Sequence, residues 1–461
     1  MGPSTQTRSK KASRKTRAPG LMATSAFSAT NPNTGPARIR YHQWIKKSDT
    51  AIRSRVCAGK VCPIISKKEI NFGTRYIMRK KKRDITTLPT MAGYRNNFWL
   101  LNEAAFSLRA LGRLAEALAP MRAGLEMRIE QKVWGSAAII ASNLSELGLT
   151  LGAVAGAVAD GARSVEYADK SGDAFQRMSK RTTHGDALHQ AGERDRARAL
   201  FVEAEGLQAE RQPQYPRLYS LQGFQYADLL LSGTERAAWR GWLVRSVVVD
   251  GSAHPPIWKR PNGGIRAPIP PDTGDLDALL AACEAVAARA EQIFEWRKLP
   301  QWNPAADPVL DIALDRLTLA RAGLVRGLLA AGEGAQDAPS PLVSPAVMDQ
   351  ANAAVEKLRE AGATHHLPRG LLTRAWARMA TGDRAGARAD LAEAWAIAEG
   401  GPMPLFQADI LLARARLFGW EAEYPGGSAR GDLQKARQLI EEHGYHRRDG
   451  ELADAEAVLG E

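Results

Sequence analysis

The sequence predicts an all-α protein: a helical-repeat superhelix preceded by a basic N-terminal arm. Two observations support this prediction. From Asn96 onward, apolar residues recur at i, i+3, i+4 and i+7, the spacing of amphipathic helices, and strand-like alternation disappears. Glycines mark the expected bends at Gly112, Gly152, Gly192 and Gly233, with spacings of 40, 40 and 41 residues. A fixed period of this size is typical of stacked helix pairs.

One phrase of the sequence occurs twice. The stretch QAGERDRARALFVEAE (190–205) returns as ATGDRAGARADLAEAW (380–395). In each copy we expect a glycine, Gly192 or Gly382, to turn the chain. The alanine five residues later, Ala197 or Ala387, is expected to lie against the preceding helix. The arginines and acidic residues of both copies are expected on the solvent face.

The helices follow one another in pairs. The expected ranges are 100–111, 114–130, 136–151, 154–170, 175–190, 194–210, 219–231, 275–296, 308–331, 346–361, 368–380, 384–399, 404–418, 432–443 and 448–459. A stretch rich in proline and glycine, 249–274, is expected to be a loop or insertion. The sequence thus divides into an arm (1–95), repeats with a 40-residue period (96–248), this insertion, and further helix pairs (275–461).

Charge separates the arm from the rest of the chain. Residues 1–95 hold 22 basic and 3 acidic residues, a net charge of +19, whereas residues 96–461 carry −6. Residues 1–40 are rich in Ser, Thr, Pro, Gly and basic residues and have no sustained apolar period, so we expect the arm to be largely disordered. Two interpretations of the arm stay open: nucleic-acid binding through its basic clusters, including RKKKR (79–83), or a solvated tail without a defined partner.

Small residues recur at fixed distances from the expected bends. Five residues after four of the bend glycines stand Ala117, Ala157, Ala197 and Ala387, where two antiparallel helices approach closely. This pattern resembles the tetratricopeptide repeat (TPR), stretched from about 34 residues to 40. Residues 365–418 also resemble the repeat regions of bacterial signalling proteins of the NACHT or NB-ARC type.

The resemblance is incomplete. Gly161 stands where a bulky residue of the second helix is usual, and Arg378 where a large aromatic residue is usual. The nucleotide-binding sequence G-x-x-x-x-G-K-[S/T] of such signalling proteins does not occur.

The resemblance implies a partner-binding groove along the first helices of successive pairs. Its expected residues are Asn102, Phe106, Arg109, Ser142, Glu146, Thr182, Asp186, His189, Arg369 and Trp376. Leu149, Leu372 and Met379 occupy the same face. Such a groove suits a peptide or a helix of a protein partner. Alternatively, its apolar members pack against the next repeat.

No motif for catalysis is found. The sequence lacks G-x-G-x-x-G, G-x-S-x-G and H-E-x-x-H, and Cys57 and Cys62 lack further metal ligands nearby. We therefore expect a non-enzymatic protein without cofactor or metal. Three cysteines suit a reducing compartment, and no apolar stretch is long enough to span a bilayer, so a cytoplasmic setting without membrane contact is expected. The resemblance to bacterial signalling proteins implies a bacterial source.

Overall fold

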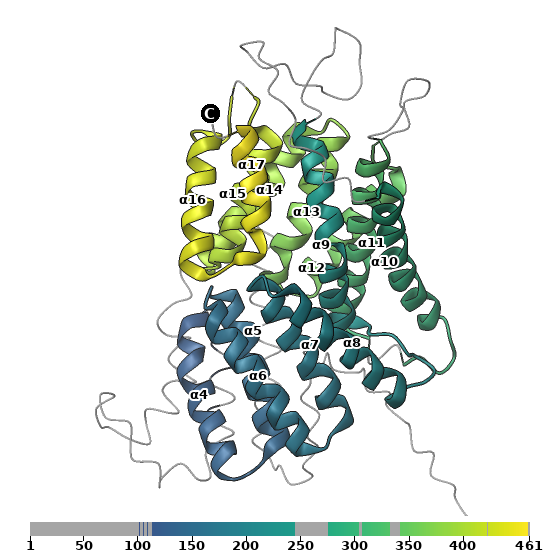
Figure 1. Cartoon of the computed structure of the whole chain (residues 1–461), viewed down its shortest axis with the longest axis vertical. Coiled ribbons are helices and arrows are strands. Elements are labelled where there is room, and N and C mark those ends of the chain that lie inside the picture. Colours follow the sequence, from purple (N-terminus) through teal and green to yellow (C-terminus); the bar gives the residue numbers. More distant parts are fainter. Residues whose placement is uncertain are drawn as a thin grey trace, which may run out of the picture. The chain divides into compact units, whose positions relative to one another are not determined.

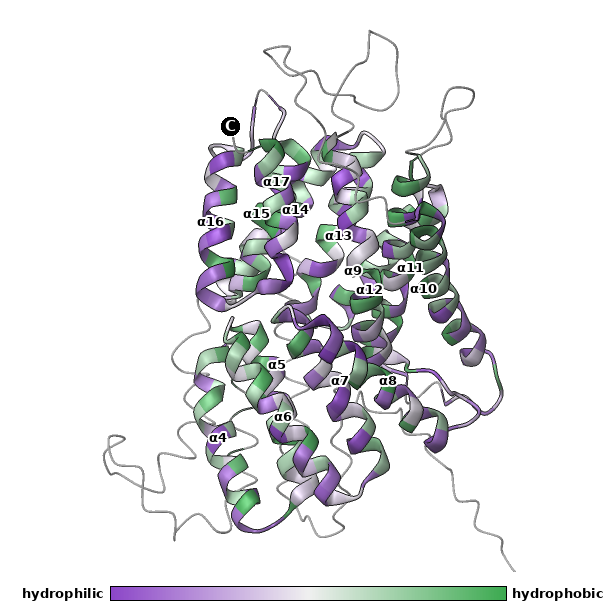
Figure 2. Cartoon of the chain, viewed as in Figure 1, coloured by the Kyte–Doolittle hydropathy of each residue, from purple (hydrophilic) through white to green (hydrophobic). Residues whose placement is uncertain are grey.

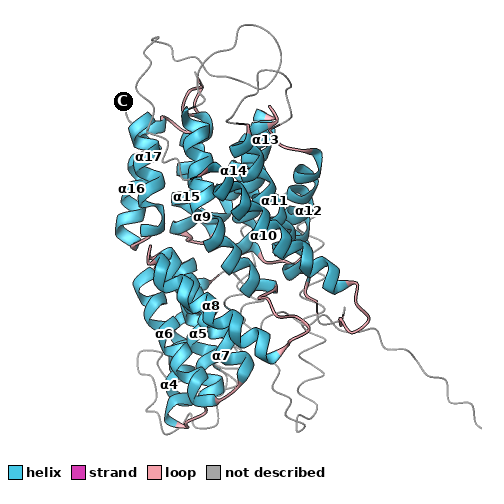
Figure 3. Cartoon of the chain, turned by 45° about the vertical axis from the view of Figure 1, so that its right-hand side comes forward, coloured by secondary structure: helices cyan, strands magenta, loops and turns pink. Residues whose placement is uncertain are grey.

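The computed structural model describes residues 113–244, 275–303, 307–331, 342–421 and 423–459, with single positions at 101, 105 and 108. Within these residues it contains fourteen α-helices, α4 to α17, and two short 3-10 helices, and no strand (Figures 1 and 3). The all-α prediction is confirmed for this part of the chain. The arm (1–95), nearly all of the first expected helix with Gly112, and the insertion (249–274) lie outside the described residues.

The helix bounds follow the sequence periodicity closely. In the first half they are α4 (Leu114–Glu130), α5 (Trp134–Thr150), α6 (Val154–Ser171), α7 (Ala174–Gln190), α8 (Arg194–Arg211) and α9 (Ser220–Val244). The second half holds α10 (Leu276–Arg297), α11 (Val309–Ala330), α12 (Pro345–Glu360), η3 (Thr364–His366), α13 (Leu367–Ala380), α14 (Arg384–Gly400), α15 (Pro404–Phe418), α16 (Ala429–His443), η4 (His446–Arg448) and α17 (Asp449–Leu459).

Three of the expected bend glycines turn the chain as predicted. Gly152, Gly192 and Gly382 have φ of +78°, +84° and +87°, a left-handed conformation that glycine adopts without steric cost. The bend expected at Gly233 is wrong, because this glycine lies inside the uninterrupted helix α9. The flanking apolar residues continue the helical pattern there, and that packing outweighs the roughly 1 kcal/mol cost of a glycine inside a helix.

Small residues bring the two helices of a pair together. Ala117, Ala157, Ala197 and Ala387 are all fully buried. Between α5 and α6 the contact is close enough for the Ser145 hydroxyl to donate to the Ala157 carbonyl at 2.8 Å. The unusual Gly161 has a role here, since a Cβ on it would lie 3.0 Å from the Cα of His184 on α7. The repeat therefore tolerates this departure because the next helix fills the space.

The expected solvent face of the repeated phrase is only partly exposed. Asp390 is 2% exposed and accepts two hydrogen bonds from Arg374, at 2.9 and 2.6 Å. Arg378, the other departure from the repeat pattern, also pairs with Asp390, at 2.9 Å. Asp390 is thus a buried link between α13 and α14. The prediction that it lies on the solvent face is wrong.

Helices pack with their neighbours in pairs, and the array also returns on itself. Extensive contacts join α5 with α6, α7 with α8, α11 with α12, α13 with α14, and α15 with α16, and also α6 with α7 of the following pair. We call α5, α7, α9, α11, α13, α15 and α17 the first helices; each also contacts the next first helix along the chain. In addition, α17 packs against α9, and α15 contacts both α5 and α9 (Figure 1). First helices from the two halves therefore face each other.

Contacts at the bends hold this return in place. The His443 imidazole Nδ1, at the end of α16, lies 3.0 Å from the carbonyl oxygen of Gly152. At the next bend, a Cβ on Gly192 would lie 3.0 Å from the Cβ of His446. Both glycines of the first half thus lie against the C-terminal helices.

Helix α7 is rich in polar residues although much of it is buried. Figure 2 shows α7 with many hydrophilic residues, whereas α11 is largely hydrophobic. Yet every residue of α7 from Met178 to Gln190 is buried. None of the described helices combines the length and the apolar character that crossing a bilayer would require. A polar helix in the interior is costly unless its groups find partners, so α7 leads directly to the functional site.

Candidate functional site

A pocket of about 180 Å³ lies where the first helices of the two halves face each other. Among the described residues, every lining side chain comes from a first helix, from η3, from η4 or from Tyr445, which precedes η4. No second helix of a pair contributes to the wall. This alternation follows from the repeat, because each pair presents the same helix to the inside.

Helix α7 brings buried polar groups to one wall. Asp186 is 6% exposed and accepts hydrogen bonds from Gln190 at 2.7 Å and from Gln225 of α9 at 3.4 Å. Burial raises the pKa of Asp186 despite the opposing positive charge of Arg369. His189 is fully buried, and burial together with the charge of Arg447 holds its pKa well below the ordinary value. The imidazole is therefore neutral at physiological pH.

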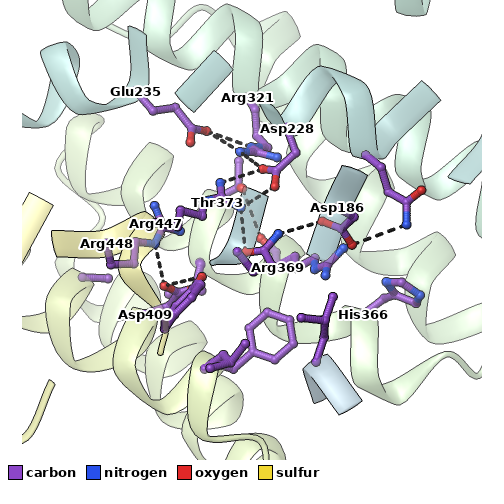
Figure 4. Close-up of a pocket in the computed structure, with 18 of the residues that line it drawn as sticks. Asp186, Asp228, Glu235, Arg321, His366, Arg369, Thr373, Asp409, Arg447 and Arg448 are labelled. Atoms are coloured by element: carbon purple, nitrogen blue, oxygen red, sulfur yellow. Dashed lines mark hydrogen bonds and ion pairs between the residues drawn. The ribbon is translucent and has the colours of Figure 1, made fainter. Parts of the chain in front are cut away.

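Ion pairs cross the pocket between distant helices (Figure 4). Arg321 of α11 donates to Asp228 at 2.7 Å and to Glu235 at 2.8 Å, both on α9. Arg447 donates to the same Asp228 from the other side, at 2.9 Å. Burial alone raises the pKa of Asp228, but the charges of Arg447 and Arg321 outweigh burial and hold it well below its usual range. Asp228 is thus a carboxylate held by two guanidinium groups.

A second set of pairs joins α15 to α17. Arg448 donates to Asp409 at 2.8 Å, and the Tyr445 hydroxyl donates to the same carboxylate at 3.1 Å. Arg416 donates to Glu451 at 2.8 Å, and Arg448 bonds to the other oxygen of Glu451. Because these charges are buried and satisfy one another, they hold the helices in place and leave little charge for a ligand.

Aromatic rings form the apolar part of the wall. Trp239 of α9 and Trp376 of α13 stack with ring centroids 3.6 Å apart and planes 8° from parallel. The guanidinium of Arg416 lies 4.1 Å from the centroid of the Trp239 ring. Phe406 adds a half-buried ring beside Arg369. Polar groups set among aromatic anchors are typical of binding pockets.

Three of the buried residues have the composition of a metal site. Asp186, His189 and Asp228 bring one ligand atom each to within 4.8 Å of the others. However, Arg447 and Arg321 already donate to Asp228, so a divalent cation would lie against two guanidinium groups. The repulsion between a buried cation and two adjacent guanidinium groups is severe. The arginines, and not a metal ion, therefore compensate the charge of Asp228.

The structure gathers some of the predicted groove residues and separates others. Glu146, Asp186, Arg369 and Trp376 line the pocket, as do Leu149 and Leu372. Ser142 and Thr182 are buried outside it, and Ser142 hydrogen-bonds to Thr183 across the α5–α7 contact at 3.2 Å. His189 lies behind the wall beside Asp228, and Met379 is buried in the core. Asn102, Phe106 and Arg109 lie outside the described side chains.

Most of the charged wall was missed by sequence reasoning. Asp228 and Asp409 stand in two copies of one short phrase, ADLLL (227–231) and ADILL (408–412). An aspartate at the same position in two otherwise apolar stretches could have indicated that both carboxylates are buried and need partners. The arginines that hold them, Arg447 and Arg448, lie where the repeat pattern is weakest, so position within a repeat gave no indication of their role.

Comparison with known proteins gives no family for this chain: neither a protein-family model nor a curated protein sequence matches it.

Proposed function

We propose that the chain is a non-catalytic protein–protein interaction module, a scaffold or sensor, whose pocket receives a short segment of a partner protein. The observation that carries this proposal is the origin of the wall, since only the first helices and their adjoining 3-10 turns line the pocket. This face is the one that resemblance to the tetratricopeptide repeat implies for partner binding.

A pocket of about 180 Å³ suits a short segment of a partner, such as a chain end, the tip of a loop or a few side chains of a helix. Half-buried side chains such as Phe406, Thr373 and His365 line the pocket, so an incoming segment can contact them.

The charged groups support binding rather than catalysis. Four of the five arginines in the wall are committed to carboxylates of neighbouring helices: Arg321, Arg416, Arg447 and Arg448. Groups that are fixed in this way position the wall and discriminate between ligands, and their removal would disturb folding first. The low cysteine content further supports a reducing compartment, and we propose the cytoplasm.

Filling the pocket tests this proposal. Thr373→Trp places a large ring at the pocket margin, and Val202→Trp adds the same ring at an exposed position of α8. We expect proteins that co-purify with the full-length chain to be lost with Thr373→Trp and retained with Val202→Trp. Thermal melting of both variants controls for folding. If both variants co-purify with the same proteins as wild type, the pocket does not bind the partner and the proposal is wrong.

The charge of residues 1–95 supports a second candidate function, which is nucleic-acid binding through the arm. A net charge of +19 in this segment suits contact with phosphates, and such binding weakens steeply with salt. Electrophoretic mobility shifts of the full chain and of residues 96–461, measured over a salt series, test this candidate. Nucleic-acid binding through the arm predicts a mobility shift with the full chain that is absent with residues 96–461. A shift of equal strength with both proteins would contradict this candidate.

A further inference from the structure

One arginine of the pocket differs from the other four. Arg369 of α13 makes no side-chain hydrogen bond or ion pair with any described residue, whereas Arg321, Arg416, Arg447 and Arg448 each hold a carboxylate. A guanidinium has five N–H donors. When such a group lines a pocket and no side chain accepts from it, its donors are available to a ligand.

The surroundings of Arg369 orient it without neutralising it. Its guanidinium carbon lies 5.5 Å from the ring centroids of both Phe224 and Phe406. Aromatic faces at this distance attract the cation and restrict the planar group, yet they take none of its N–H donors. The Thr373 hydroxyl, one turn further along α13, donates to the Arg369 carbonyl at 3.1 Å and lies in the same wall.

The neighbouring acid Asp186 does not take the place of a ligand. The charge of Arg369 opposes the rise in the pKa of Asp186 that burial causes, and the two residues lie near each other in the pocket (Figure 4). Asp186, however, is nearly buried and accepts from Gln190 and Gln225, whereas Arg369 is only half-buried. An incoming acceptor therefore meets Arg369 at the margin of the pocket.

We propose that Arg369 receives a carboxylate of the bound segment, either a chain-terminal carboxylate or the side chain of an Asp or Glu. A carboxylate matches the planar fork of a guanidinium with two parallel hydrogen bonds. The apolar wall made by Leu221, Leu372 and Leu405 suits the apolar part of the same residue. This inference rests on the proposed function, because it assigns the chemistry of the segment that the pocket takes.

The test uses the full-length chain and arrays of short random peptides, made with free and with amidated C-termini. Wild type is expected to select peptides that carry a carboxylate. Arg369→Gln is expected to bind them about 10- to 100-fold more weakly, which corresponds to the loss of hydrogen bonds to a charged group. Arg369→Lys keeps the charge but not the fork and is expected to bind with intermediate strength. Arg198→Gln, at an exposed arginine of α8, is the matched control and is expected to bind as wild type does.

The outcomes separate the two claims. Loss of binding on amidation identifies a chain-terminal carboxylate, and retained binding identifies an acidic side chain. Equal binding of the selected peptides by wild type and a folded Arg369→Gln overturns the role of Arg369 and leaves the proposed function intact. If wild type selects no peptide above the level of Thr373→Trp, the proposed function fails. Melting with succinate or glutamate as carboxylate probes then separates the two failures: stabilisation that Arg369→Gln abolishes supports Arg369 as the group that binds a carboxylate, and no such stabilisation overturns that role.

Discussion

The guanidinium of Arg447 donates to both carboxylate oxygens of Asp228, which lies 219 residues earlier on α9. The next residue, Arg448, donates to Asp409 of α15 at 2.8 Å. Two consecutive arginines thus join helices from distant repeats. Because both aspartates stand in the wall of the pocket, the pairs that return the array on itself also fix the shape of the pocket.

Removing one of these carboxylates should destabilise the fold strongly. Asp228→Ala leaves Arg447 as a buried charge without its carboxylate, a change that typically costs about 3–5 kcal/mol. Urea denaturation measures this loss in the free energy of unfolding. The control, Arg437→Ala, breaks an exposed pair with Glu456 and should cost only about 0–1 kcal/mol. Similar small losses for both variants would show that the Asp228–Arg447 pair does not hold the two halves together.

Two bend glycines allow the contact between the halves to be measured separately from backbone strain. Gly152 and Gly382 share a left-handed conformation, with φ of +78° and +87°. A Cβ on Gly152 would overlap Pro404 and lie 2.7 Å from His443 Nδ1, whereas a Cβ on Gly382 meets nothing within 4 Å.

Gly382→Ala should therefore cost only the strain of an alanine in this conformation, about 1–2 kcal/mol. Gly152→Ala should cost about 1–3 kcal/mol more, because it also displaces the C-terminal helices. Denaturation midpoints of the two variants provide the comparison. Equal losses would mean that the α5–α6 bend is free of the C-terminal half.

Acid should weaken the C-terminal end of the array through Glu451. Burial raises the pKa of this carboxyl, but the charges of Arg448 and Arg416 outweigh burial and lower it to about 2. The ordinary value is 4.5, so the unfolded chain binds the proton first as pH falls. Stability that is present above pH 4.5 is therefore lost between about pH 4.5 and 2, by about 3 kcal/mol.

Glu451→Gln isolates this contribution. The variant should be less stable than wild type at neutral pH, and the difference between the two should shrink as pH falls from 4.5 to 2. Urea denaturation at several pH values measures it. Glu356→Gln, at an exposed glutamate of α12, should differ from wild type by the same small amount throughout. A constant difference for Glu451→Gln as well would refute the assigned cause.

The sequence was most informative about local structure. Helix bounds such as α4 (Leu114–Glu130) and the bends at Gly152 and Gly192 follow from periodicity and from the conformational freedom of glycine. The error at Gly233 has a physical reason, because a glycine is compatible both with a bend and with a helix whose packing compensates for it.

Contacts between distant repeats were beyond sequence reasoning. A 40-residue period indicates how each helix pair packs on the next pair. It gives no information about contacts between distant pairs, such as the contact between α15 and α5. The register did place Glu146, Asp186, Arg369 and Trp376 on the inner face, and all four line the pocket. It could not show that the opposite wall comes from the C-terminal helices, because that depends on small rotations accumulated over many repeats.

Site-specific photo-crosslinking tests the central claim, a partner segment in the pocket, most directly. Replacing Phe406 with the photoreactive residue benzoylphenylalanine keeps an aromatic ring in the pocket wall, and the same replacement at Val202 on α8 is the control at a position that is 58% exposed. After irradiation of cells that express the full-length chain, we predict a defined adduct with another protein from position 406 and none from position 202. No adduct from position 406, or the same adduct from both positions, would contradict the account.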